Sequence, residues 1–102
     1  MIIYQHLGSI PAITIPQAFM ERYKSTPNHV VYQVERNNEY VKWTWAEFKN
    51  DVFAFAKAMS YLGVNERKCV NIIGFNSPEW VISFFAAILY NAVPAGVYTT
   101  NN

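Results

Sequence analysis

An unbroken apolar run from Trp80 to Tyr90 limits what this chain can fold into more than any other part of the sequence. Only Ser83 interrupts the run, so a helix formed here would have no polar face. Such a helix is buried in a large protein or spans a membrane, but about 11 residues are too few for a bilayer, which takes about 20. A chain of this size buries only about 60–70% of its unfolded surface. We therefore expect a buried helix in a larger α/β domain, whose remaining layers lie outside these residues.

Capping signals predict two helices before this run. Thr14 is followed three residues later by Gln17, and Thr44 is followed at the same spacing by Glu47. This is the capping-box pattern. The first helix is expected to end at residues 25–28, and the second to run from about residue 45 to 62, with Gly63 as a left-handed stop. The expected apolar face of the second helix consists of Phe48, Val52, Phe55, Ala56, Met59 and Leu62.

Two pairs of strands are predicted around these helices. Val30–Glu35 and Tyr40–Trp43 alternate in polarity and flank a polar turn, which is typical of a β-hairpin. Cys69–Ile73 has the composition of a largely buried strand, and Val93–Tyr98 is predicted to be a second apolar strand. Ser77 caps the apolar helix that lies between these two strands. The order strand, helix, strand predicts a βαβ motif with parallel strands.

Charge and cysteine content exclude several classes of protein. The chain carries 8 Lys+Arg against 7 Asp+Glu, a formal net charge of +1, and lacks the basic stripe that a nucleic-acid partner needs. A single cysteine excludes an internal disulfide framework and indicates a reducing compartment. The N-terminus has no signal-peptide pattern. We expect a cytoplasmic location, no nucleic-acid partner and no transmembrane segment.

The loop Gly74–Ser77 is the main candidate for a ligand-binding edge. It follows a predicted parallel strand and opens a helix, and open α/β sheets bind ligands at the carboxyl ends of their strands. Most such loops only cap a helix, so a capped βα turn is the favoured interpretation. The chain contains neither G-x-G-x-x-G nor G-x-x-x-x-G-K, the glycine-rich loops that cradle phosphates.

Other residues with chemical potential have simpler interpretations. His6 and His29 stand alone, as structural or solvated histidines do, and Cys69 is expected to be an inert buried thiol. Glu47 and Glu79 are explained by helix caps and the helix dipole.

The aromatic residues of the apolar run are interpreted as core. Trp80, Phe84 and Phe85 are expected to pack inside the domain, with a role in an acyl pocket as the alternative. No second carboxylate suggests an acid/base pair. The sequence therefore assigns no catalytic, cofactor-binding or metal-binding residue.

Four segments taken together carry a resemblance to a known family. They are Lys42–Phe48, Tyr61–Gly63, Gly74–Trp80 and Gly96–Asn101. In this order and at these spacings they resemble the N-terminal part of AMP-forming long-chain acyl-CoA synthetases, most of all the bubblegum-type branch. The resemblance covers roughly residues 11–101. Each motif alone is weak, but the ordered set is fairly specific.

This resemblance implies an adenylate-forming fold with a large N-terminal α/β domain and a small mobile C-terminal domain. It implies a parent ligase that uses ATP and Mg²⁺ to join a fatty acid to AMP and then transfers the acyl group to coenzyme A. The family's phosphate loop, Tyr-Gly-x-Thr-Glu segment, ribose-binding acid and C-terminal lysine have no counterpart in these residues. The segment alone is therefore expected to be inactive and to bind none of these cofactors.

The expected organisation is α/β: residues 1–12 as an irregular N-terminal arm and residues 13–102 as an incomplete N-terminal portion of an AMP-binding domain. The implied partners are the fatty acid substrate and the missing remainder of that domain. The chain is a fragment, a truncated gene model or a degenerate copy, and the sequence leaves these three alternatives open. Two other functions are also left open: a non-catalytic interaction module and part of another adenylate-forming enzyme. Peripheral contact with an intracellular membrane is a further alternative.

Overall fold

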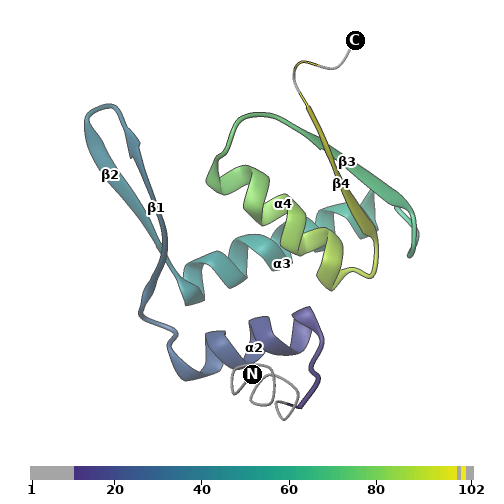
Figure 1. The fold of residues 1–102 in the computed structure, drawn as a ribbon, viewed down its shortest axis with the longest axis horizontal. Helices are drawn as coiled ribbons and strands as arrows, with labels where there is room; N and C mark the ends of the chain where they lie inside the picture. Colours follow the sequence, from purple (N-terminus) through teal and green to yellow (C-terminus); the bar gives the residue numbers. More distant parts are fainter. Residues whose placement is uncertain (1–10, 99, 101–102) are drawn as a thin grey trace, which may run out of the picture.

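The computed structural model describes residues 11–98 and 100, in which helices and strands are arranged in layers (Figure 1). The elements are α2 (Ile15–Ser25), β1 (Val30–Arg36), β2 (Glu39–Thr44), α3 (Trp45–Tyr61), β3 (Cys69–Ile73), α4 (Pro78–Leu89) and β4 (Val93–Val97). Helix α4 packs against α3 on one side and against both β3 and β4 on the other. This is the mixed α/β architecture predicted from the sequence. Most of the predicted arm 1–12, including His6, lies outside the described residues.

Each helix begins at a side-chain hydroxyl on an extended residue. At α2, the Gln17 N–H donates to Thr14 Oγ1 at 3.2 Å and the Thr14 N–H donates to Gln17 Oε1 at 2.9 Å, which confirms the predicted capping box. At α3, the Glu47 N–H donates to Thr44 Oγ1, but the Glu47 carboxylate accepts from the Thr44 hydroxyl at 3.1 Å. The second capping box is therefore only half formed.

Removing the first cap has a measurable cost. Thr14→Ala is expected to lower the free energy of unfolding by about 1 kcal/mol, because the Gln17 N–H loses its acceptor at the start of α2. Urea denaturation measures the change. Ser25→Ala, at the exposed end of the same helix, is the control and should change stability by less than about 0.5 kcal/mol. Equal effects for the two variants would contradict the capping role.

The predicted hairpin is confirmed and is tighter than the sequence indicated. Strands β1 and β2 pair antiparallel up to Arg36 and Glu39, which leaves a two-residue turn. Asn37 and Asn38 have φ angles of 53° and 63°. Turns of this left-handed kind match the twist of a hairpin, and asparagine tolerates the conformation well. The hairpin projects to one side of the helices in Figure 1, and both α3 and α4 contact it.

The predicted parallel pair is also confirmed, with Cys69 opposite Val93 and Ile73 opposite Val97. Strand β4 ends at Val97 instead of at Tyr98. The prediction of a largely buried β3 is wrong: Ile72 is its only buried residue. The sheet has only two strands among the described residues, and helix α4 covers one face of it.

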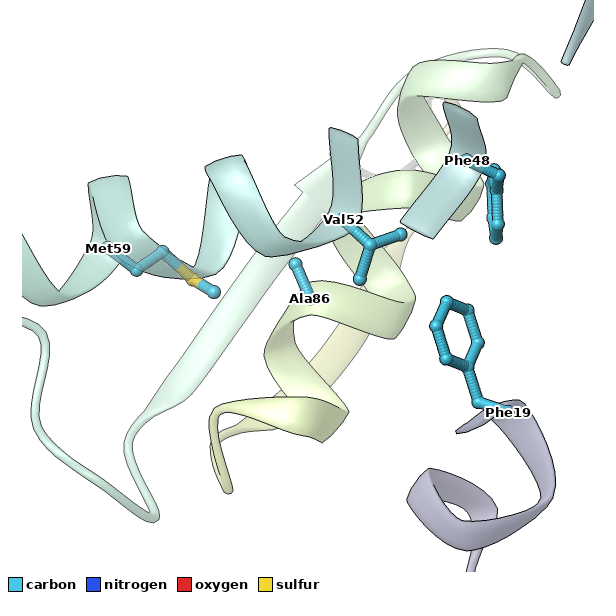
Figure 2. Close-up of a cluster of buried hydrophobic side chains, with 5 residues drawn as sticks. All are labelled: Phe19, Phe48, Val52, Met59 and Ala86. Atoms are coloured by element: carbon cyan, nitrogen blue, oxygen red, sulfur yellow. The ribbon is translucent and has the colours of Figure 1, made fainter. Parts of the chain in front are cut away.

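The core lies where α2, α3 and α4 meet. Its buried cluster consists of Phe19, Phe48, Val52, Met59 and Ala86, which face one another in Figure 2. The predicted apolar face of α3 is therefore partly right. Phe55 and Leu62, which the spacing placed on that face, are exposed by 38% and 78% because they stand at its margins.

Helix α4 is only partly enclosed. Of its residues, Pro78, Ala86 and Ala87 are buried, and the large side chains from Trp80 to Leu89 are half-buried. The expected full burial of this helix is therefore not reached among the described residues.

Candidate functional site

The carboxyl ends of β3 and β4 form the candidate site. The loop Gly74–Ser77 leaves β3 there and leads directly into α4. Two open hollows of about 340 and 380 Å³ flank this loop. Both are lined by Gly74 and Trp80. The loop that the sequence singled out therefore borders both hollows.

Trp80 lines both hollows and lies close to Phe84 and Gly96. Its ring stacks on Phe84, with centroids 5.7 Å apart and planes at 15°. Behind it, Gly96 lies so close that a Cβ atom there would stand 3.4 Å from Cζ2 of Trp80. Any side chain larger than a methyl group at Gly96 would therefore push against the indole.

An aromatic chain connects Trp80 to the core. Phe84 packs edge-on against Phe85 at 5.6 Å, and Phe85 contacts Phe19 at 5.5 Å and Phe48 at 6.0 Å. Phe85 thus belongs to the core packing, the interpretation favoured by the sequence. Phe84 lies between that core and Trp80, contacting Phe85 on one side and Trp80 on the other.

An ion pair ties the site to the hairpin. Arg36 Nη2 donates to both carboxylate oxygens of Glu79, at 2.7 and 2.8 Å. This guanidinium holds the pKa of the Glu79 carboxyl below its usual value. The Arg36 guanidinium also lies 5.9 Å from the ring centroid of Trp43, whose indole N–H donates to Asp51 at 2.9 Å.

The lowered pKa of Glu79 makes this pair sensitive to acid. Its stabilisation is present at neutral pH and is lost as the pH falls through the lowered pKa, since protonation then removes the charge that Arg36 binds. Because both side chains are substantially exposed, Glu79→Gln should cost at most about 1 kcal/mol at pH 7. Thermal melts over a series from pH 7 into the acid range measure the difference, which should shrink as the pH falls through the lowered pKa of Glu79. Glu21→Gln, on an exposed residue of α2, is the control.

The polar groups around the loop are largely committed to structure. The Ser77 hydroxyl accepts the Trp80 N–H at 3.2 Å, and the Ser83 hydroxyl donates to the Glu79 carbonyl at 2.7 Å. Within residues 11–98 and 100, no group of three or more His, Cys, Asp or Glu side chains could hold a metal ion. The geometry here offers apolar contact surface and no paired acid and base.

The two other candidates, His29 and Cys69, lie outside the loop Gly74–Ser77. His29 is exposed; its backbone N–H donates to the Thr26 carbonyl and its carbonyl accepts from the Trp45 N–H, so the residue connects the end of α2 to the start of α3. Cys69 was predicted to be buried, which is wrong: the thiol is exposed, because it stands on the uncovered face of β3. Its Sγ lies 3.4 Å from Oδ1 of Asn71.

Sequence reasoning missed two features of the site. Arg36 and Glu79 are 43 residues apart, and no local pattern connects them. The close approach of Gly96 to Trp80 did have a signal, because a glycine inside a strand often marks a place where another group comes near.

Solved structures with a similar fold include adenylate-forming enzymes. The N-terminal subdomain of Klebsiella oxytoca NpsA superposes with a TM-score of 0.80 and 22% identity, over 89% of this chain and 23% of that one. A fatty acid AMP ligase from Legionella pneumophila gives a TM-score of 0.75 and 12% identity, over 84% of this chain and 15% of that one. The fold is therefore that of an adenylate-forming N-terminal domain.

Residues 19–102 match the model of the AMP-binding enzyme family, and the chain belongs to this family. Long-chain-fatty-acid–CoA ligase ACSBG2 of Xenopus laevis is 30% identical over 94% of this chain, and long-chain-fatty-acid–CoA ligase heimdall of Drosophila melanogaster is 34% identical over 92% of it. The resemblance to bubblegum-type synthetases is thus confirmed. The chain spans 13–14% of the length of these relatives.

Proposed function

We propose that this chain is the N-terminal portion of the AMP-binding domain of a long-chain fatty acid–CoA ligase, and that it supplies scaffold to the enzyme without contributing catalytic groups. The family match through residue 102 and the long-chain ligases among the relatives support the proposal. The parent would use ATP, Mg²⁺ and coenzyme A. In this proposal, residues 13–102 form one incomplete unit of that domain.

A segment exchange tests the scaffold role. The part of the Xenopus laevis ligase that aligns with this chain is replaced by the chain, and fatty-acid-dependent release of pyrophosphate is measured in the hybrid and in the chain alone. We expect turnover in the hybrid and none in the isolated chain. Turnover by the isolated chain, or a folded but inactive hybrid, would refute the proposal.

Matched variants separate folding from chemistry in this assay. Phe48→Ala in the hybrid should abolish turnover through loss of the folded state, because Phe48 is 1% exposed. Phe55→Ala, on the same helix but 38% exposed, should retain it. Circular dichroism of both hybrids reports the folded fraction.

A non-catalytic interaction module is the second candidate function. Exposed aromatic side chains at the site favour it: Phe75 and Tyr98 are 84% and 77% exposed, and exposed apolar patches often mark association surfaces. Size-exclusion chromatography of the purified chain discriminates, since a monomer that stays monomeric at high concentration counts against this candidate.

The described helices include none long and apolar enough to cross a membrane.

A further inference from the structure

Helix α3 carries a second apolar face besides the one packed in the core. Its buried residues belong to the core with α2 and α4. Five exposed residues of the helix and its C-terminal cap recur at spacings of three, four and seven, which places them together on another side: Ala54, Phe55, Ala58, Tyr61 and Leu62. We call these five residues the outer face of α3. The side of a helix that is turned away from its core is normally polar, so this face is unusual.

The outer face is most exposed at its C-terminal end. Tyr61 and Leu62 are 93% and 78% exposed, and Phe55 is 38% exposed. Burying apolar side chains that are this open to water is favourable, roughly in proportion to the area removed. Contiguous apolar surface of this kind often marks a place where another molecule binds.

The two ends of the outer face carry opposite charges. Glu47 and Asp51 precede Phe55 on the same row of the helix at intervals of four residues, and both are exposed. Lys57 is exposed one turn before Tyr61. The connection to β3 adds one exposed acid and two exposed bases after the helix: Glu66, Arg67 and Lys68. The N-terminal end of the face is therefore acidic and the C-terminal end is basic.

Lys49 does not neutralise the acidic end, although it lies between Glu47 and Asp51 in the sequence. Its ammonium group is 5.1 Å from the ring centroid of Tyr23 and 4.6 Å from that of Phe53. Tyr23 belongs to α2, so Lys49 is turned towards the packed side of α3. The two acidic side chains are left as the charges beside the start of the outer face.

A surface that is acidic at one end and basic at the other is complementary to itself when it is turned end to end. A two-fold dimer brings the same surface of each subunit together in this way. We propose that the outer face of α3 binds a second copy of this chain, with the two α3 helices antiparallel. The proposal holds for either function above, because α3 is not part of the loop Gly74–Ser77.

Small side chains in the middle of the outer face suit such a helix crossing. Ala54 and Ala58 let two helices approach closely, since the distance between helix axes depends on the side chains at the contact. A crossing centred between them places Asp51 opposite the partner's Tyr61. The partner's Lys57 then stands four residues away, about 6 Å along the axis, within reach of a lysine side chain.

The charge pattern favours a second copy over a lipid surface. Apolar side chains beside lysines also suit an anionic membrane, but such a membrane would repel Glu47 and Asp51. A single pair of helices makes a small contact, below about 1,200 Å² of total buried surface, which is typical of weak association. We therefore expect a reversible dimer that dissociates at the low concentrations used for optical unfolding.

Sedimentation velocity of the purified chain over a concentration series tests the pairing. Leu62→Lys places a charge on the outer face and should raise the dimer dissociation constant at least about 10-fold. Ser60→Lys adds the same charge at an exposed residue of the same turn that lies off the outer face, and should leave the constant unchanged. A chain that is monomeric throughout the series would overturn the proposal. So would equal dimerisation of the two variants, since the contact would then lie elsewhere.

A charge exchange tests the antiparallel arrangement. Lys57→Glu and Asp51→Lys should each weaken self-association at least about 10-fold, because each sets like charges against one another at both ends of the dimer. An equimolar mixture of the two variants should associate as tightly as the original chain, because opposite charges then meet at both ends. A mixture that associates no better than either variant alone would contradict the antiparallel pairing. Circular dichroism confirms that each variant is folded.

Two further measurements identify any other occupant of the outer face. The hybrid with the Xenopus laevis ligase should dimerise like the chain and lose this property with Leu62→Lys. A monomeric hybrid would show that the rest of the domain covers the face, which would overturn the proposal. Cosedimentation of the chain with phosphatidylserine vesicles that is lost in Leu62→Lys, without a dimer in solution, would assign the face to lipid and overturn it as well.

Discussion

Replacing Phe48 by alanine is expected to lower the free energy of unfolding by about 3–5 kcal/mol. Phe48 is 1% exposed and contacts three aromatic rings, those of Phe19, Trp45 and Phe85. Truncation leaves a cavity where α2, α3 and α4 meet, so it loosens all three helices together. Urea denaturation followed by circular dichroism measures the loss.

Phe55→Ala is the matched control for this prediction. It removes the same side chain from the same helix, but Phe55 lies at the margin of the buried face and is 38% exposed. Its cost should be under about 1 kcal/mol. Similar losses for the two variants would mean that the core does not centre on Phe48.

Enlarging Ala86 to leucine is expected to destabilise the chain by about 1–3 kcal/mol. Ala86 is 0% exposed, and in Figure 2 its methyl group points from α4 towards α3, between Met59 and Val52. The extra carbons have no space unless the two helices move apart. Thermal unfolding should therefore begin at a lower temperature in this variant.

Ala58→Leu provides the comparison for overpacking. Ala58 is exposed on α3, so the added carbons extend into solvent and stability should change by less than about 0.5 kcal/mol. A stabilised Ala86→Leu variant would show that the helix crossing contains unfilled space.

Local signals made most of the elements predictable. The hydroxyl caps at Thr14, Thr44 and Ser77 mark the helix starts that the structure has, and Gly63 adopts the expected left-handed conformation with φ 84°. These features depend on a few neighbouring residues. The parallel pairing of β3 and β4 was also predictable, because it follows from the local order of strand, helix and strand.

Burial was harder to predict because it depends on what covers an element. An apolar strand such as β3 was expected to be buried, yet Cys69 and Ile73 are exposed in a sheet whose second face is open. The contact of Arg36 with Glu79 was equally out of reach, since it joins segments 43 residues apart. At the site, the loop could be located from sequence, but the wall formed by Trp80 against Gly96 needed coordinates.

The hydroxyl at the start of every described helix has a consequence for the order of events during protein synthesis. Because each helix carries its own start signal, these helices need no distant residue to set their boundaries. During synthesis, N-terminal domains generally fold before the domains that follow them, each as a unit. The three helices can therefore begin to form as soon as their own residues have been made.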